Sequence, residues 1–364
     1  MTVLLVGNFL SASVGNRGVC EDLADRLRGA GWNIITTSTR RGRVSRLADM
    51  LATVWQRRGE YDVANVDVYS GPAFFWAEAV AWALRRVGKP YVLTLHGGAL
   101  PEFAEQWPGR VRRLLASAAA VTAPSGFLVE SLRPYRPDLR LIPNALDLAQ
   151  YPFRHRRTPQ ARLVWVRAFH EIYDPSLAVR VLAEIRARHP EAALEMVGPD
   201  KHDGSLGRTR AMAQELGVAE AVEFTGRVPK SRIAERVSAG DIFLNTTTID
   251  NTPVSVMEAM ACGACVVSTR IGGIPHLVSD GEDGLLVPAR DARAMAAAVE
   301  RLLTEDGLAA RLSLAARAKT QAFDWSVVLP QWEDVLLGIE TGVATRRGAA
   351  RGGACATYET HDIV

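Results

Sequence analysis

The sequence predicts an α/β protein with two Rossmann-like domains, each a doubly wound parallel sheet, that face each other across a cleft. The chain has 364 residues, more than one hydrophobic core usually organises, and 48% of them are apolar. Short runs suited to strands alternate with helical segments almost from end to end, which is typical of parallel sheets joined by right-handed crossovers. A stretch with three prolines, residues 142–160, interrupts this alternation and predicts the hinge.

The predicted strands follow one another in regular order. Those of the first half are Val3–Val6, Asn33–Thr37, Val63–Val66, Tyr91–Leu95, Ala120–Ala123 and Leu139–Ile142, with helices such as Arg17–Gly29 and Pro72–Val87 between them. Those of the second half are Arg162–Val166, Ala193–Val197, Val222–Thr225, Ile242–Asn245, Cys265–Ser268 and Gly284–Val287. Ligands of such sheets bind outside the carboxyl ends of the strands, so we expect the site in the cleft.

These patterns set the expected domain boundaries. Residues 1–150 form the first domain and residues 160–322 the second. We expect residues 323–340 to form a helix that returns to the first domain. Residues 341–364 are rich in Gly, Ala, Arg and Thr, and we expect a disordered tail.

Composition excludes several classes of protein. The formal net charge of +3 disfavours a dedicated nucleic-acid binder, although basic residues are in excess within residues 1–155. The first residues lack the basic start of a signal peptide, and the longest apolar stretch, 73–84, is shorter than the roughly 20 residues that span a bilayer. We therefore expect a cytoplasmic protein. Cys262 and Cys265 form a C-x-x-C without a second ligand pair, which favours buried structural residues over a zinc or redox site.

The stretch from Thr246 to Asp291 is the most informative part of the chain. Within it Thr252 is a good helix N-cap, and Pro253 suits the first helical position. A helix beginning there presents free backbone N–H groups at Val254 and Ser255, together with the positive end of its dipole. This arrangement predicts a diphosphate site, although helix capping alone also explains the Thr-Pro pair.

Two acidic residues accompany this predicted helix start. Glu258 falls inside the helix, where its carboxylate can accept two hydrogen bonds from a cis-diol such as ribose. Asp250 lies in the loop just before the helix, where it can meet the hydroxyls of a sugar. Taken singly, an acid on a solvated helix face is the commoner explanation of such residues.

At this point the sequence resembles a known family. Asp250 and Glu258, followed by AMACG at Ala259–Gly263 and GGIP at Gly272–Pro275, resemble the signature of the large family of retaining glycosyltransferases with the GT-B fold, family 4 or glycosyl transferases group 1. That family includes sucrose and glycogen synthases. The chain departs from the pattern where Asp250 replaces the usual glutamate and where His276 replaces a common acid.

The resemblance continues more weakly over residues 1–335 and implies further roles. Arg167, at the end of a predicted strand, is implied to clamp the donor diphosphate, a role suited to a planar, permanently charged group. Ile172 and Tyr173 stand where the family usually has a second, lysine clamp, so Lys201 or the helix end near Pro175 are alternatives for that charge.

The first domain has weaker site candidates. His96 follows a predicted strand and is implied to contact the donor sugar, although a lone histidine is more often a structural hydrogen-bonding residue. Gly15 lies in the first strand-to-helix loop, where a small residue lets the backbone approach phosphate or acceptor. Asn144 and Asp147 fit the hinge motif of the family.

The resemblance implies an enzyme that moves a sugar from a nucleotide diphosphate donor, bound by the second domain, to an acceptor on the first domain, with retention of anomeric configuration. The sequence offers no convincing aspartate pair for a metal, so we expect metal-independent transfer with no cofactor besides the donor substrate. We expect the acceptor to be a sugar, a lipid-linked sugar or a small molecule, and the pathway to be surface polysaccharide or glycolipid synthesis.

Three points stay open at the level of the sequence. The basic segment from Arg40 to Arg58 predicts either peripheral contact with the inner face of a membrane or an ordinary amphipathic helix. A nucleotide-sugar epimerase or hydrolase would use the same cleft. A catalytically silent sugar-nucleotide-binding scaffold would also explain the missing lysine and the aspartate at 250.

Overall fold

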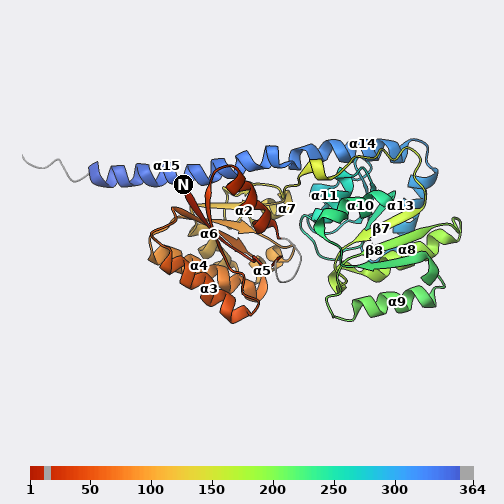
Figure 1. Ribbon diagram of the computed structural model, residues 1–364, viewed down its shortest axis with the longest axis horizontal. Helices are drawn as coiled ribbons and strands as arrows, with labels where there is room; N and C mark the ends of the chain where they lie inside the picture. The colour runs from red at the N-terminus through yellow and green to blue at the C-terminus, as the bar shows by residue number, and fades with distance from the viewer. Residues whose placement is uncertain (12–17, 353–364) are drawn as a thin grey trace, which may run out of the picture.

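The computed structural model describes residues 1–11 and 18–352, with side chains up to residue 339, and contains two six-stranded sheets (Figure 1). All strand pairs within the sheets are parallel. The strand orders are β2-β1-β3-β4-β5-β6 and β12-β11-β10-β7-β8-β9. This confirms the predicted fold class of two Rossmann-like α/β units.

The first sheet is built within the first 141 residues. Its elements are β1 (Thr2–Val6), α2 (Val19–Gly29), β2 (Asn33–Thr37), α3 (Arg43–Gln56), β3 (Val63–Val68), α4 (Phe74–Arg86), β4 (Tyr91–Leu95), α5 (Leu100–Gln106), α6 (Pro108–Ala116), β5 (Ala120–Ala123), α7 (Gly126–Leu132) and β6 (Arg140–Leu141). Buried side chains of α3 and α4 form a core with one face of the sheet, and those of α2 form a core with the other. Because both faces are covered, its central strands are mostly apolar, with a few polar residues such as Asn65 and Asp67 in β3.

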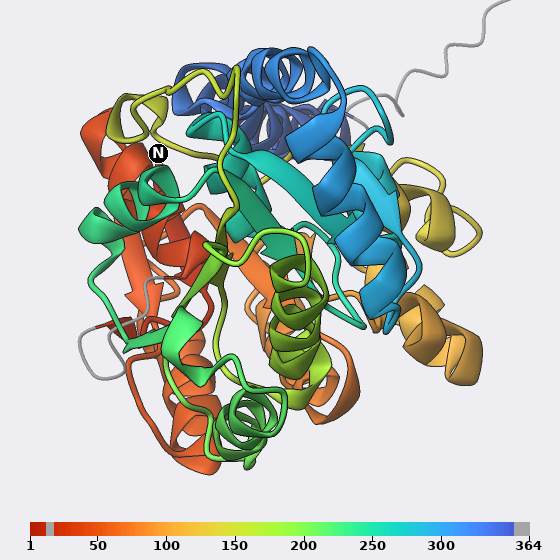
Figure 2. The same cartoon turned by 90° about the vertical axis from the view of Figure 1, so that its right-hand side faces the viewer.

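The second sheet follows the same plan. Its elements are β7 (Arg162–Val166), α8 (Pro175–Arg186), β8 (Ala193–Val197), α9 (Ser205–Glu215), β9 (Val222–Gly226), α10 (Ile233–Ala239), β10 (Ile242–Asn245), α11 (Val254–Ala261), β11 (Cys265–Thr269), α12 (Ile274–Leu277), β12 (Leu285–Val287), α13 (Ala292–Thr304) and α14 (Leu308–Thr320). One core lies beneath α8 and α13, and a second lies beneath α10 and α11. Figure 2 views this unit end on, with helices on both sides of its sheet.

The chain crosses between the two units twice, and the crossings lie side by side. Leu146 N–H donates to the carbonyl of Phe323 at 2.8 Å, and the Trp325 N–H donates to the carbonyl of Leu146 at 3.0 Å. The last helix, α15 (Trp325–Gly352), then runs back along the first unit, where Trp325, Val328 and Trp332 join the core beside α2 (Figure 1). The helix continues beyond residue 340, where the sequence suggested a disordered tail.

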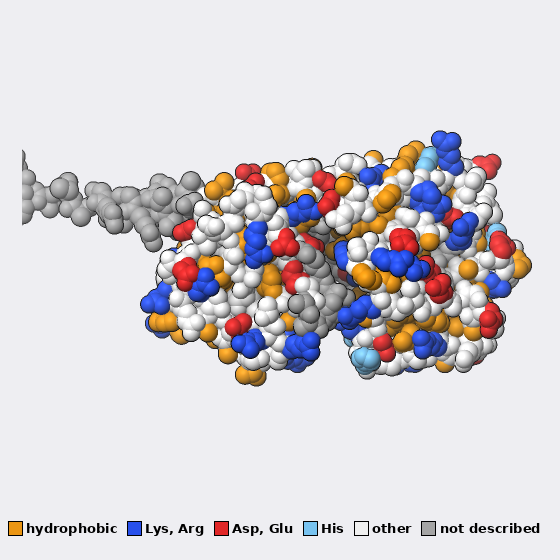
Figure 3. All heavy atoms as spheres, in the orientation of Figure 1, with side chains coloured by type: hydrophobic (Ala, Val, Ile, Leu, Met, Phe, Trp, Pro, Cys, Tyr) orange, Lys and Arg blue, Asp and Glu red, His pale blue; other side chains and the backbone are white. Residues whose placement is uncertain are grey.

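The two units meet across a hollow. Figure 3 shows two lobes with acidic side chains on the first-domain side of the hollow and basic side chains on the second-domain side. Within the described residues, no helix has the length and apolar character needed to cross a membrane.

Candidate active site

A pocket of about 340 Å³ lies where β7, β8 and β9 end and α11 begins, and we call it the second-domain pocket. It is lined by Val166, Arg167, Ala168, Tyr173, Val197, Gly198, Pro199, Lys201, Arg227, Val228, Lys230, Ile233, Val254, Ser255 and Glu258. The ends of neighbouring parallel strands form this edge, as the sequence predicts. Four of the predicted site residues therefore share one pocket: Arg167, Val254, Ser255 and Glu258.

The start of α11 opens into this pocket, one residue later than the sequence suggested. Pro253, not Thr252, occupies the N-cap position, and its backbone is extended. The first helical hydrogen bond is donated by the Val256 N–H to the Pro253 carbonyl at 3.1 Å, so the Val254 and Ser255 amides precede it. Ser255 is 8% exposed, and its Oγ is buried without a hydrogen-bond partner in the described part of the chain.

The predicted capping role of Thr252 is wrong. Its hydroxyl instead donates to the Pro124 carbonyl at 3.3 Å, in the first domain. The Asn144 side-chain amide donates to the Thr252 carbonyl at 3.2 Å. Thr252 therefore links the two domains. Its hydroxyl and its carbonyl, the two groups that an N-cap residue uses, are both bonded to groups outside α11.

Arg167 follows the last residue of β7 and enters the same pocket. Its guanidinium forms an ion pair with Asp250 and lies over the Tyr173 ring, with Cζ 4.6 Å from the ring centroid. Its Nε is buried without a hydrogen-bond partner among the described residues. Gly198 (φ +152°) allows this strand end to pack closely, since a Cβ there would overlap the Arg167 carbonyl.

Glu258 lies on α11, and its side chain is only 4% exposed. The Tyr151 hydroxyl donates to its Oε1 at 2.8 Å, and the Lys230 ammonium pairs with the same oxygen. Oε2 takes part in no hydrogen bond within the described residues. The Glu258 carboxylate is thus held through Oε1. Its Oε2 can accept a hydrogen bond from a ligand that carries a hydroxyl group.

The pocket is richer in cationic groups than the sequence suggested. Lys201 lines it, as one of the predicted alternatives for the missing lysine, and so do Arg227 and Lys230. Lys230 was missed by sequence reasoning because it contacts the site from a short turn, Lys230–Arg232, outside the signature stretch. Together with Arg167, these side chains give the pocket the positive character that a diphosphate needs.

His96 lies in the first domain rather than in this pocket. Its Nε2 lies 3.1 Å from Asp67 Oδ1, and its ring stacks on Tyr69 with centroids 5.0 Å apart. It lines a separate small cavity of about 20 Å³ in the first domain, closed by the hinge residue Asn144 and by Trp325 of α15. His96 is thus held in place by Asp67 and Tyr69, and it lies outside the second-domain pocket that contains Glu258.

Asp250 lies at the seam between the domains. It connects to the second-domain pocket through Arg167, while its backbone packs so closely on Gly98 that a Cβ there would lie 2.6 Å from the Asp250 carbonyl oxygen. Its neighbour Asn251 bonds to Ser125 of the first domain. Gly15, the remaining predicted residue, lies outside the described residues.

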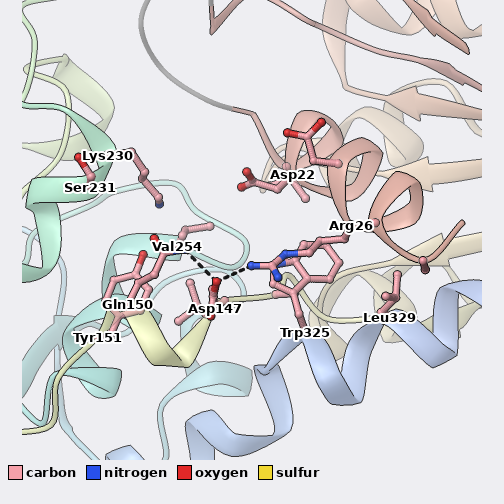
Figure 4. Close-up of a pocket in the computed structure, with 16 residues that line it drawn as sticks. Asp22, Arg26, Asp147, Gln150, Tyr151, Lys230, Ser231, Val254, Trp325 and Leu329 are labelled. Carbon is pink, nitrogen blue, oxygen red and sulfur yellow. Dashed lines mark hydrogen bonds and ion pairs between the residues drawn. The ribbon is translucent and has the colours of Figure 1, made fainter. Parts of the chain in front are cut away.

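A larger pocket of about 830 Å³ adjoins the first one and shares Lys230 and Val254 with it. In Figure 4, Asp22 and Arg26 of α2 lie across this pocket from Lys230 and Ser231, and Arg26 bonds to Asp147 of the hinge at 2.6 Å. The two pockets meet at Lys230 and Val254, and Asp250 is not among the residues that line either of them.

Two features of the described residues concern metal ligands and thiols. No group of three or more His, Cys, Asp or Glu side chains there is placed to hold a metal ion. Cys262 and Cys265 are buried and free, and burial raises the pKa of the Cys265 thiol to about 12. These cysteines therefore remain protonated thiols that pack in the core.

Comparisons with known proteins identify the family. Residues 18–150 match the family described as Glycosyltransferase Family 4, and residues 160–305 match Glycosyl transferases group 1. D-inositol 3-phosphate glycosyltransferase of Acidothermus cellulolyticus is 30% identical over 338 residues, covering 83% of this chain and 72% of the relative. A GDP-mannose-dependent alpha-(1-6)-phosphatidylinositol monomannoside mannosyltransferase of Mycolicibacterium smegmatis is 33% identical over 43% of this chain and 40% of its own length.

Solved structures show the same fold at low sequence identity. Sucrose-phosphate synthase of Thermosynechococcus elongatus superposes with a TM-score of 0.78 and 19% identity, covering 94% of this chain and 99% of that chain. Anabaena HepE, solved in complex with UDP and glucose, gives a TM-score of 0.74 and 19% identity over 93% of this chain and all of its own. The chain therefore belongs to glycosyltransferase family 4, the group 1 glycosyl transferases, and is a glycosyltransferase with the GT-B fold.

Proposed function

We propose that this enzyme binds a nucleotide diphosphate sugar in the second-domain pocket and transfers the sugar, with retention and without a metal ion, to an acceptor on the first domain. The observation that carries the proposal is a pair of buried donors, Ser255 Oγ and Arg167 Nε, that have no partner among the described residues and lie beside the first amides of α11. Buried polar groups normally have partners, so two orphan donors in a cationic pocket are suited to an anionic ligand.

In the proposed complex the diphosphate lies against Val254, Ser255 and Arg167, and the ribose lies against Glu258. The sugar then extends toward Asp250, at the domain seam. As the anomeric bond breaks, negative charge develops on the leaving diphosphate, and the helix amides and Arg167 stabilise it. The leaving phosphate receives the acceptor proton. Closure of the domains on the sugar excludes water and limits hydrolysis.

For the acceptor we propose a polyol or sugar, free or phosphorylated or carried by a lipid, in surface polysaccharide or glycolipid synthesis. The family relatives named above include enzymes whose names specify inositol phosphate and phosphatidylinositol monomannoside. The proposed location is the cytoplasm.

The decisive experiment measures binding and turnover on the full chain. Thermal melts with UDP-, GDP- and ADP-sugars identify the donor, because a ligand at 100 times its Kd stabilises by about 2.7 kcal/mol. Turnover is then assayed with and without EDTA over an acceptor panel, and NMR gives the anomeric configuration of the product. Retention with EDTA-insensitive turnover supports the proposal. Complete donor conversion without acceptor indicates an epimerase or hydrolase, and binding without turnover indicates a scaffold.

A second part of the proposal concerns contact with an anionic membrane. Val44, Ala48, Ala52 and Trp55 are exposed and lie at helical spacing on one face of α3. Val44 is 84% and Trp55 56% exposed. Arg58 lies over the Trp55 ring, 5.3 Å from its centroid, and Arg43 begins the helix. An apolar stripe edged by arginines matches the chemistry of an anionic bilayer surface.

Vesicle co-sedimentation tests this part separately. We expect the protein to sediment with vesicles of phosphatidylglycerol and phosphatidylcholine and to remain in solution with phosphatidylcholine alone. The variant Val44→Asp/Trp55→Asp should lose this binding, whereas Leu314→Asp, at an exposed leucine of the second domain, should keep it. Equal sedimentation of the two variants contradicts the assignment of α3.

A further inference from the structure

Tyr151 connects the interdomain linker to the proposed donor site. It lies in the segment between the two sheets and is 5% exposed. Its hydroxyl donates to Glu258 Oε1 at 2.8 Å, while its backbone carbonyl accepts from Arg317 Nη1 at 3.1 Å. The hydroxyl and the backbone of Tyr151 are therefore both held by hydrogen bonds. Within the described residues, this linker residue is one of two donors to the Glu258 carboxylate.

The two donors to Glu258 differ in how firmly they hold it. The Lys230 side chain is 43% exposed, so water screens its charge and competes for its ammonium. The Tyr151 hydroxyl is enclosed in the core formed with Leu146, Leu148 and Met257. Burial, together with the neighbouring Glu258, raises the pKa of Tyr151, so the hydroxyl keeps its proton and always donates.

Holding Oε1 in this way has a geometric result. A glutamate side chain has several rotatable bonds, and an unrestrained carboxylate would sample many positions. With Oε1 occupied, Oε2 is the oxygen left to accept a hydrogen bond from a ligand in the second-domain pocket. A single buried hydroxyl therefore sets which carboxylate oxygen faces the ligand.

We propose that Tyr151 is a positioning residue for donor recognition: through Glu258 Oε1 it orients Oε2 to accept a hydrogen bond from a ribose hydroxyl. This inference rests on the proposed function, in which Glu258 binds the ribose. It adds a residue outside the signature stretch and makes the linker part of the nucleotide site. Removal of the Tyr151 hydroxyl should reduce the preference for ribose over deoxyribose more than it weakens binding of the diphosphate.

The test compares Tyr151→Phe with Tyr61→Phe. Phenylalanine keeps the packing of each ring, and the Tyr61 hydroxyl makes a comparable buried bond, 3.0 Å to the Val54 carbonyl, in the first domain. Calorimetry measures the Kd of UDP, GDP and ADP, and the tightest ligand is then compared with its 2′-deoxy and 3′-deoxy counterparts. Melting curves confirm that each variant is folded.

For the wild type and Tyr61→Phe we expect the loss of one ribose hydroxyl to weaken binding about tenfold, the size of one hydrogen bond to a charged group. In Tyr151→Phe that ratio should fall to about twofold or less, while kcat with the intact donor stays within about twofold of wild type. An unchanged ratio in Tyr151→Phe overturns the inference.

Glu258→Ala separates this inference from the proposed function, because alanine removes both carboxylate oxygens. If Glu258→Ala retains full discrimination against the deoxy ligands, the ribose role of Glu258 is wrong and the proposed donor site is wrong with it. If Glu258→Ala loses discrimination while Tyr151→Phe keeps it, Glu258 binds ribose without help from Tyr151, and only the positioning role is rejected.

Discussion

Arg167 and Asp250 form an ion pair that joins the end of β7 to the loop before α11. The pair connects the second-domain pocket, which Arg167 lines, to the domain seam, where the backbone of Asp250 meets Gly98. The Asp250 carboxylate therefore holds the guanidinium at the edge of the pocket. A diphosphate would compete with that carboxylate for the same cation.

Arg167→Lys tests the need for a planar fork. A lysine keeps the charge but places all its donors on one nitrogen, so it cannot reproduce the planar fork that spans Asp250 and a phosphate, and we expect kcat/KM to fall about 10- to 100-fold. Steady-state kinetics measures the change. Arg180→Lys is the control, because Arg180 pairs with Asp174 on the surface of α8; equal losses in both variants would reject a specific role.

Asp250→Asn should separate binding from catalysis. Removal of the carboxylate charge releases Arg167, so we expect a nucleoside diphosphate to bind the same or a few-fold tighter. Transfer should nevertheless slow by about 10-fold or more, because the sugar loses a charged hydrogen-bond acceptor. Calorimetry and kcat are the two measurements. Weaker binding combined with a normal kcat would show that Asp250 serves the diphosphate rather than the sugar.

Gly98→Ala should disturb the seam between the domains. The added Cβ would lie 2.6 Å from the Asp250 carbonyl oxygen, so the domains must shift apart. Since small displacements of reacting groups are costly, we expect kcat to fall about 10-fold or more with little change in donor Kd. Gly109→Ala, where a Cβ meets nothing within 4 Å, is the matched control.

The buried cysteines make a prediction about reactivity and pH. Iodoacetamide at pH 8 should leave Cys262 and Cys265 unmodified in the native protein and modify both in denaturant, as peptide mass spectrometry can determine. Burial raises the pKa of Cys265 to about 12, whereas a thiol in an unfolded chain ionises near 8.5. The unfolded state therefore loses protons first, and stability should decrease as pH rises above about 9. Labelling of the native thiols at pH 8 would contradict their burial.

The sheets could be predicted because burial on both faces makes each central strand a short apolar run. β7 and β8 match the predicted ranges, and β12 begins one residue later than expected. Local patterns also predicted a helix end near Pro175, where the Asp174 side chain caps α8 by accepting from the Leu177 N–H at 3.2 Å. Such features depend on neighbours in sequence, so no tertiary information is needed.

The errors and omissions depend on contacts between distant segments. Thr252 has a capping side chain, but Pro124 of the first domain takes its hydroxyl. Tyr151 and Lys230 converge on Glu258 from separate segments, with no motif to mark either of them. The family resemblance identified Arg167 and Glu258 as site residues. The side chains that bond to them could be found only from the structure.

The return of the last helix to the first lobe affects how the nascent chain can fold. Trp325, Val328 and Trp332 pack beside α2, although more than 160 residues of the second lobe are synthesised between them and β6. While those residues leave the ribosome, one core layer of the first lobe lacks its partner helix and exposes apolar surface. The second lobe, whose sheet is complete at β12, can therefore finish folding before the lobe that is made first.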